Sequence, residues 1–441
     1  MRLLSAVLLL ALASPGDGVA DAAWATEAVA RLNALLEAPN SERAGSADRL
    51  VSEHLALDEF TAATFGDYLE ESLDAYRGLL SSPRFTHLVE HYRSRLARAY
   101  QHRLRADLAV QLASSDWRSL RLDSLEVNGQ RGRAQLRALF ATRSLGMEAD
   151  LILADGTWKV AELKIDGRPV SSHYRRRYQS LIDRGHSPPV MEAQLAEREY
   201  VVLEDFAATW DGSQPMEWGP WKKKDRLKPV LYRVEGRPSA ELGTSASSVE
   251  SSKPRRYMVA RDSSHSVILG KFVHWNPRRY PIMTWCWRAA ALPQGGNEFL
   301  DDANDSAAGL YVIFSKNWLG VPKQLKYVWS TTLPEGTVGR RDKIFRPWFF
   351  VVESGTTNLG KWTFEVVDLE KHHREKLGGR PAKRTIGLGL LTDANSTRSY
   401  AEAYYADLRV WTREAFDGGR VVNHCGGLPI SNGAYSGENS E

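Results

Sequence analysis

The feature that most constrains the fold is a series of short alternating segments between Val201 and Trp411. Within each segment apolar and polar residues alternate with a period of two, and clusters of Gly, Pro, Asn and Asp separate the segments. Each such strand has one apolar face that must be covered, which two packed sheets achieve. We therefore expect an all-β sandwich of jelly-roll type over residues 199–415, followed by an irregular tail at 416–441.

The preceding part of the chain predicts a different architecture. From Thr26 to Leu112 apolar residues recur at spacings of three and four, which indicates helices. The period then changes to two over four successive segments: Leu120–Leu125, Gln135–Thr142, Met147–Leu153 and Trp158–Ile165. Asn128-Gly129 and Asp155-Gly156 supply hairpin turn signals. Residues 26–198 are thus expected to form an α+β domain, with helices laid on one antiparallel sheet.

Length and composition are consistent with two domains. A chain of 441 residues that is 43% hydrophobic is too long for one ordinary core. We place the boundary near Arg198, after a segment that contains Pro188 and Pro189 and before the β pattern that starts at Val201. Residues 236–256 are Ser-rich and poor in apolar residues, so we expect a mobile insertion within the second domain.

The N-terminal sequence predicts export. Arg2 precedes the apolar run Leu3–Leu12, which is too short to span a bilayer and is typical of a secretory signal peptide over residues 1–25. No second long apolar run follows, so we expect a periplasmic protein that does not span the membrane. The formal net charge of +4, from 58 Lys and Arg against 54 Asp and Glu, gives no reason to expect nucleic acid as a partner.

The chain has two cysteines, Cys286 and Cys425. Because they lie far apart in sequence, we favour two idle or buried thiols, and a disulfide formed in an oxidising compartment is the alternative.

Trp158–Leu181 carries a family resemblance. A strand ends at Asp166-Gly167, Pro169 stiffens the connection, and a basic helix follows. This order resembles the closing strand and helix of the periplasmic phospholipid carriers of the Mla or toluene-tolerance family, and the likeness extends over Leu50–Leu195. Gly167, Tyr174 and Arg175 agree with the family pattern. Three positions depart from it: Glu162 stands where the family has Asp, Pro169 where it has Ser, and His173 where it has Asn.

The resemblance implies an apolar cavity between sheet and helices that holds the acyl chains of a phospholipid or similar amphiphile. Burying such chains is worth about 0.8 kcal/mol per CH₂. On this basis the expected lipid-contact residues are Leu136, Phe140, Leu151, Leu153, Trp158, Tyr174, Arg175 and Tyr178. The alternative is a filled core made of the same side chains.

The second domain is similar to a bacterial domain family whose function is unknown. The matching motifs are Pro281–Arg288, Lys326–Trp329, Glu353–Trp362 and Leu390–Val410. This resemblance implies a jelly-roll fold and no particular activity.

A ligand site in the sandwich is a further hypothesis. Its candidate residues are Trp285, Trp287, Arg288, Asp302, Trp329, Glu353 and Asp393. Two Trp residues at i and i+2 could stack on a sugar ring, although a core position is the favoured interpretation. Glu353 and Asp302 could act as a glycosidase pair if their separation were suitable. The loop aspartates could hold a structural Ca²⁺, although their spacing is not that of a calcium loop. We assign no metal site, cofactor or catalytic residue.

The sequence as a whole favours an exported lipid-binding protein fused to a β-sandwich that binds an envelope membrane protein or a glycan. The rival hypothesis is a glycan-active enzyme whose site lies in the sandwich. A third is a structural interaction protein with neither pocket.

Overall fold

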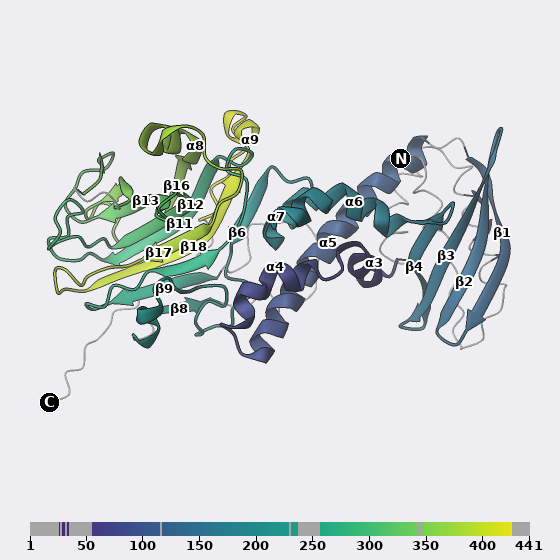
Figure 1. Cartoon of the computed structure of the whole chain (residues 1–441), viewed down its shortest axis with the longest axis horizontal. Coiled ribbons are helices and arrows are strands. Elements are labelled where there is room, and N and C mark those ends of the chain that lie inside the picture. The colour runs from purple at the N-terminus through teal and green to yellow at the C-terminus, as the bar shows by residue number, and fades with distance from the viewer. Residues whose placement is uncertain are drawn as a thin grey trace. The chain divides into compact units, whose positions relative to one another are not determined.

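The computed structural model describes residues 55–114, 117–228, 231–236, 256–341 and 346–425, together with Thr26, Val29, Ala30, Asn33 and Ala34. The expected signal peptide, nearly all of the expected insertion at 236–256 and residues 426–441 lie outside the described residues. The chain divides into two compact units (Figure 1). The first unit comprises residues up to Asp74 and Val89–Arg198, and the second comprises Ala75–Leu88 and the chain from Glu199 onward.

An antiparallel sheet forms the first unit's β layer. Its strands follow one another in the order of the sequence: β1 (Trp117–Asn128), β2 (Arg131–Phe140), β3 (Ser144–Ala154), β4 (Thr157–Ile165) and β5 (Arg168–Pro169). The turns explain this meander. Asp155 and Gly156 both have positive φ, at 54° and 73°, and so do Asp166 and Gly167, at 50° and 72°. Two consecutive positive φ values define the tight hairpin turn whose twist matches that of the flanking strands.

Alternation gives the sheet one charged and one apolar face. On β2 the side chains of Arg133 and Arg137 are exposed, whereas Leu136 and Phe140 are buried. The charged face is crossed by ion pairs, for example from Arg133 Nε to Asp150 Oδ1 at 3.2 Å. Because neighbouring side chains point to opposite faces of a sheet, the apolar residues must be covered by another layer.

Helices of the first unit pack together around tyrosines. The helices that contain residues of this unit are α3 (Leu57–Phe65), α4 (Tyr68–Arg77), α5 (Ser82–Ser114), α6 (Val170–Asp183) and α7 (Pro188–Leu195). The rings of Tyr100 on α5 and Tyr174 on α6 meet edge to face, with centroids 5.1 Å apart. Thr64 on α3 donates to the Tyr100 hydroxyl at 3.0 Å, and Tyr174 donates to Asp107 at 3.0 Å. These bonds link three helices, of which α3 and α6 also contact β4.

Two sheets make up most of the second unit. The seven-stranded sheet has the order β14-β15-β13-β12-β17-β10-β7, and the six-stranded sheet has the order β16-β11-β18-β9-β8 with β6 also paired to β18. The strands are β6 (Tyr200–Glu204), β7 (Gly219–Pro220), β8 (Tyr232–Glu235), β9 (Tyr257–Asp262), β10 (Leu269–Phe272), β11 (Ile282–Ala291), β12 (Ala308–Lys316), β13 (Pro322–Ser330), β14 (Val338–Gly339), β15 (Trp348–Ser354), β16 (Thr363–Asp368), β17 (Gly387–Leu391) and β18 (Ala401–Trp411). Short helical elements complete it: the 3₁₀ helix η2 (Lys223–Leu227), α8 (Leu369–His373), the π-helical turn η4 (Arg374–Gly378) and α9 (Arg413–Asp417). The predicted fold class, an α+β domain followed by a β-sandwich, is confirmed.

Aromatic side chains fill the space between the two sheets. Trp285 and Trp287 on β11 contact Tyr327 and Trp329 on β13, with ring centroids 5.5 Å and 6.2 Å apart. All four are at most 1% exposed. Truncating such a ring in a packed core typically costs about 3–5 kcal/mol. These tryptophans are therefore core residues, which fixes the orientation of every other side chain on β11 and β13.

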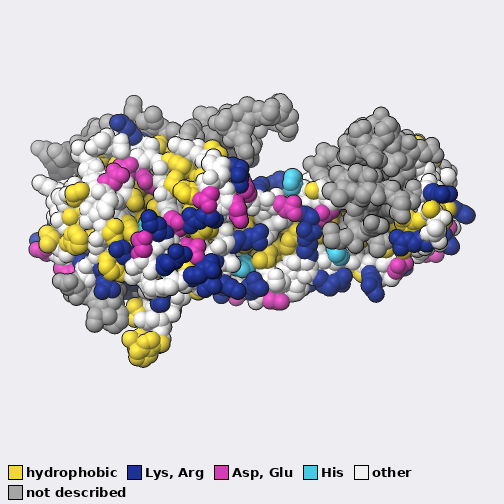
Figure 2. Space-filling model, turned by 90° about the horizontal axis from the view of Figure 1, so that it is seen from above, with side chains coloured by type: hydrophobic (Ala, Val, Ile, Leu, Met, Phe, Trp, Pro, Cys, Tyr) yellow, Lys and Arg dark blue, Asp and Glu magenta, His cyan; other side chains and the backbone are white. Residues whose placement is uncertain are grey.

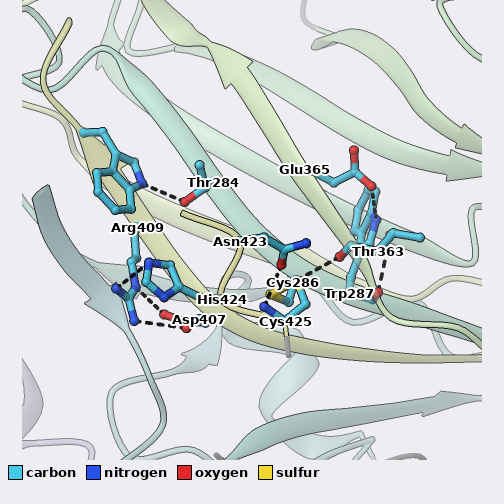
Figure 3. Close-up of a disulfide and its surroundings, with 11 residues drawn as sticks. Thr284, Cys286, Trp287, Thr363, Glu365, Asp407, Arg409, Asn423, His424 and Cys425 are labelled. Carbon is cyan, nitrogen blue, oxygen red and sulfur yellow. Dashed lines mark hydrogen bonds and ion pairs between the residues drawn. A yellow bond between two sulfur atoms is a disulfide. The ribbon is translucent and has the colours of Figure 1, made fainter. Parts of the chain in front are cut away.

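A disulfide joins Cys286 to Cys425, so the expectation of two idle thiols is wrong (Figure 3). Cys286 lies between two core tryptophans on β11 and must point to the opposite, outer face of the six-stranded sheet. There it joins a cluster with Tyr257, Tyr404 and Cys425. The two Cα atoms are 5.5 Å apart although 139 positions separate them in sequence. Folding, not sequence spacing, creates this proximity.

Candidate functional site

The residues expected to contact lipid divide into two groups. The apolar face of the first unit's sheet carries Leu136, Phe140, Leu151, Leu153 and Trp158. Helix α6 carries Tyr174, Tyr178 and Arg175. The sheet residues are buried except Leu153, which is half-buried, and both tyrosines are buried among the helices whereas Arg175 is exposed.

An open hollow of about 690 Å³ lies between α3 and the sheet of the first unit. Of the eight expected lipid-contact residues, all of which the structure describes, only Leu151 lines it. Most of its lining is charged or polar and includes Glu59, Arg133, Asp150 and Glu162. The strand register pairs Arg133 with Asp150, and Asp150 with Glu162, so these residues form a row across the charged face. The hollow is therefore suited to polar groups more than to acyl chains.

The candidate residues in the sandwich do not meet at one site. Trp285, Trp287 and Trp329 lie in the core between the sheets, where a ligand could reach them only if the sandwich opened. Arg288 lies on the outer face of the six-stranded sheet, with its guanidinium 3.9 Å from the centre of the Tyr404 ring. The remaining three differ in exposure and surroundings: Asp302 is exposed, whereas Glu353 and Asp393 are buried in different places.

Glu353 has an acidic neighbour, Glu365, that the sequence did not single out. Asn358 Nδ2 donates to both Glu353 oxygens, at 3.1 and 3.2 Å. Glu365 on β16 accepts a hydrogen bond from Trp287 Nε1 at 3.0 Å. Burial is the main reason why the pKa of Glu365 is raised to about 7, and the charge of Glu353 raises it further. Glu365 therefore changes protonation near neutral pH.

A groove of about 290 Å³ lies on the outer face of the seven-stranded sheet. Its orientation follows from the core, because Tyr327 and Trp329 point toward the other sheet and Lys326, next to Tyr327 in the strand, must point away from it. Lys326 on β13, Tyr311 on β12 and Leu391 on β17 line the groove from three neighbouring strands.

A chain of hydrogen bonds fixes the floor of the groove. Lys326 Nζ donates to Ser306 Oγ at 3.1 Å, and Ser306 in turn donates to Glu298 Oε1 at 2.8 Å. Ser330 donates to the second oxygen of Glu298 at 2.6 Å. Lys326 is 5% exposed and Glu298 is 1% exposed. Because a buried charge is costly unless it is paired and hydrogen-bonded, this network explains how a lysine is retained on the sheet.

Asp393 stands beside Lys326 at the end of β17 and is the one predicted sandwich residue that lines the groove. Burial is the main cause that raises its pKa to about 7, and the charge of Asp305 adds to this while Lys326 opposes it. Asp305 is engaged elsewhere, by the backbone N–H groups of Ser396 at 3.1 Å and Thr397 at 2.6 Å. A carboxyl that titrates near neutral pH in a concave site is typical of a functional group.

The rim of the groove is aromatic and cationic. Trp221 lies flat on the backbone of β10, where a Cβ atom at Gly270 would be 2.3 Å from the Trp221 ring. Glycine at this position therefore allows the indole to reach the groove. Arg341 and Arg346 line the groove as well, and Arg341 donates to Asp301 at 2.8 Å.

Sequence reasoning missed Lys326 as a site residue although it begins a motif that had been singled out. The available signal was its position: a lysine between Leu325 and Tyr327, within the apolar run of residues 325–329. A charged residue on a strand that is buried on both sides requires a partner, and here the partners come from the loop that precedes β12.

Comparisons with known proteins find a family model that matches part of the sandwich. Residues 243–409 match a family model described as a protein of unknown function (DUF3047). No curated protein matches the chain. Among solved structures, a phospholipid-binding protein from Ralstonia solanacearum in complex with a phospholipid is similar over 41% of this chain and 97% of its own, with 13% identity and a TM-score of 0.28. A TM-score this low supports no conclusion about the fold or ligand of this chain.

Two absences among the described residues concern membranes and metals. No helix there is both long and apolar enough to cross a bilayer. No group of three or more His, Cys, Asp or Glu side chains is arranged there to hold a metal ion.

Proposed function

We propose that this protein is a binding protein whose groove on the seven-stranded sheet holds a polyhydroxylated ligand, a short segment of an envelope glycan. The observation that supports this most is the meeting of Lys326 and Asp393, both buried, beside the Tyr311 ring in one concave site. Small-molecule sites combine such walls with a few converging polar groups, and typical volumes begin at roughly 300 Å³.

The chemistry of the groove matches that of a sugar. Each hydroxyl both donates and accepts a hydrogen bond, so a sugar can donate to the Asp393 carboxylate and accept from Lys326. The rings of Trp221 and Tyr311 offer apolar surfaces for the C–H faces of a pyranose.

Binding, not hydrolysis, is the activity we propose for this groove. Glycosidases use two carboxyl groups placed on either side of the scissile bond. Glu298 lines the groove, but Ser306 and Ser330 each donate to one of its oxygens. Among the described lining residues this leaves Asp393 as the carboxyl that can serve a ligand.

The test is a glycan array probed with the full secreted chain, followed by calorimetry on the best ligand. Lys326→Met and Asp393→Asn should each weaken binding at least about tenfold, because each removes a charge-assisted hydrogen bond. The matched control is Lys361→Met at an exposed position, which should bind like the parent. Unchanged affinity in both groove variants, or hydrolysis of the ligand, would contradict the proposal.

Phospholipid binding by the first unit is our second candidate function. It is supported by the apolar sheet face, where Leu136, Leu151 and Trp158 lie together under a second layer. An acyl chain could occupy this interface if the layers part. Native mass spectrometry with lipid extraction, on protein purified from its own cells, should then detect a bound phospholipid.

Ala149→Phe supplies the sharper version of that experiment, because Ala149 is fully buried at the centre of the same face. If a chain lies there, the new ring should displace the lipid and leave the fold intact. If the face is a filled core, overpacking should lower the free energy of unfolding by about 1–3 kcal/mol, and no lipid should be seen even in the parent. Gln135→Phe on the opposite face is the control.

We also propose that the protein is exported to the periplasm. The expected signal peptide motivates this, and the Cys286–Cys425 bond supports it, because structural disulfides persist in oxidising compartments. Residues 1–25 fused to a phosphatase that is active only outside the cytoplasm should yield activity, and an inactive fusion would contradict export.

A further inference from the structure

The hairpin between β12 and β13 carries the most exposed large hydrophobic side chain among the described residues. At its tip Trp318 is 90% exposed and the adjacent Leu319 is 56% exposed. Apolar groups exposed in this way at a protruding tip commonly mark an interaction site, since a partner can remove them from water. In Figure 2 a hydrophobic group projects from the surface of the second unit.

Four backbone N–H groups of the tip are hydrogen-bonded within the hairpin. Asn317 N–H donates to the Val321 carbonyl at 2.8 Å, and Gly320 N–H donates to the Asn317 carbonyl at 2.9 Å. The Asn317 side chain accepts from the N–H groups of Leu319 at 3.0 Å and Val321 at 2.9 Å. A tip built like this can enter an apolar medium without leaving those groups unpaired.

Basic residues surround the base of the hairpin. The strand register places residues 374–386, which lead into β17, at the same end of the sheet, because Gly387 pairs with Ile313 near the end of β12. The loop before β11 joins them through a bond from Arg278 to the Pro381 carbonyl at 2.6 Å. We call this set the basic surface: Lys316, Lys323, Arg278, Arg374, Arg380 and Lys383.

The proximity and the excess of positive charge have independent support. The pKa of His373 is lowered by burial first and then by the charges of Lys323 and Arg278. Glu370 pairs with Arg374 at 3.6 Å and with Arg380 at 2.8 Å, so one carboxylate is shared between two guanidinium groups.

We propose that the hairpin inserts Trp318 and Leu319 into the interfacial region of an anionic phospholipid bilayer while the basic surface contacts the headgroups. Tryptophan prefers the membrane–water interface, and clustered Lys and Arg are attracted to anionic lipids. Stable attachment of this kind takes two signals, and the hairpin end supplies an apolar anchor and a polybasic surface together. Neither the tip residues nor those of the basic surface line the groove, so the inference does not depend on the proposed function.

A protein partner fits this surface less well. The cores of protein interfaces are broad and packed, and lysine is depleted in them. Here lysines and arginines surround a narrow apolar tip. A bilayer can accept such a tip at any rotation about its axis, because a bilayer has no fixed shape to match.

Vesicle sedimentation with the full chain tests the proposal. The protein should bind vesicles of phosphatidylglycerol and phosphatidylcholine in equal parts at least about tenfold better than pure phosphatidylcholine vesicles, and high salt should weaken binding. The double variant Trp318→Ala, Leu319→Ser should lose at least about tenfold in binding, whereas Val422→Ser, at a position that is 55% exposed, should not. Lys316→Glu combined with Lys383→Glu should abolish the preference for anionic lipid.

Brominated lipids give a second readout that does not depend on affinity. Their bromine atoms quench a tryptophan that enters the bilayer, so bound parent protein should be quenched more than the bound Trp318→Ala variant. Equal quenching of the two proteins would overturn the proposal, and so would equal vesicle binding by the parent and the hairpin variant. Failure of the parent to bind any vesicle, while an envelope protein captures it through the hairpin, would also overturn it.

Discussion

Replacing Asp393 by Asn should stabilise the protein at alkaline pH and leave it almost unchanged at acid pH. The pKa of this carboxyl is raised from 3.8 to about 7 in the folded state. Between those two values the folded protein holds a proton that the unfolded chain has lost, so the free energy of unfolding falls as pH rises through this window. A pKa difference of this size between the folded and unfolded states lowers the free energy of unfolding by about 4 kcal/mol at pH 8. Asn cannot ionise and avoids that cost.

The gain from Asp393→Asn should therefore grow by about 2–3 kcal/mol between pH 5 and pH 8. Urea unfolding followed by tryptophan fluorescence measures it, and most tryptophans lie in the second unit. Asp302→Asn, at an exposed position, should give no such pH-dependent gain. If Asp393→Asn destabilises the protein equally at both pH values, then the carboxylate is ionised and well paired in the folded state, and the reasoning about burial is refuted.

Three further changes probe other parts of the sandwich. Breaking the Cys286–Cys425 bond, by Cys425→Ala or by a reductant, should lower the free energy of unfolding by about 5 kcal/mol, because the bond closes a loop across a separation of 139 residues. An unchanged denaturation midpoint would show that the bond contributes little. Glu365→Gln should stabilise the protein by about 3 kcal/mol at pH 8, because the pKa of Glu365 is raised from 4.5 to about 7, and this gain should vanish near pH 4 in the same unfolding assay. Gly270→Ala should push Trp221 off the strand and weaken ligand binding in calorimetry with little change in thermal midpoint; retained affinity would mean that Trp221 takes no part in binding.

Most of the sandwich could be predicted because its signals are local. Alternation along residues 281–291 puts Trp285 and Trp287 on one face of the strand and Cys286 on the other, as in the structure. The same alternation could not say which sheet would lie opposite. It also could not show that Cys425 would reach Cys286, because that depends on where a distant segment returns.

The candidate site was predicted less well for a related reason. Asp393 was selected, but Lys326 was overlooked and the three tryptophans were placed with residues that lie elsewhere. A strand pattern identifies two faces without showing which of them is open to a ligand. That distinction arises only when one face of β13 has been covered by the other sheet, which leaves Lys326 on the outside with Ser306 and Glu298.

The sequence by itself determined the elements of this protein, because turn formation and side-chain alternation depend on neighbouring residues. Asp155-Gly156 and Asp166-Gly167 adopt the positive φ values that their composition favours, and the meander follows from them. Only the tertiary structure decided which segments meet. It paired β13 with β15 in parallel, joined cysteines 139 positions apart, and assigned residues 75–88 to the second unit. Contacts of this kind form because distant apolar surfaces leave water together, and no local pattern records which surfaces those will be.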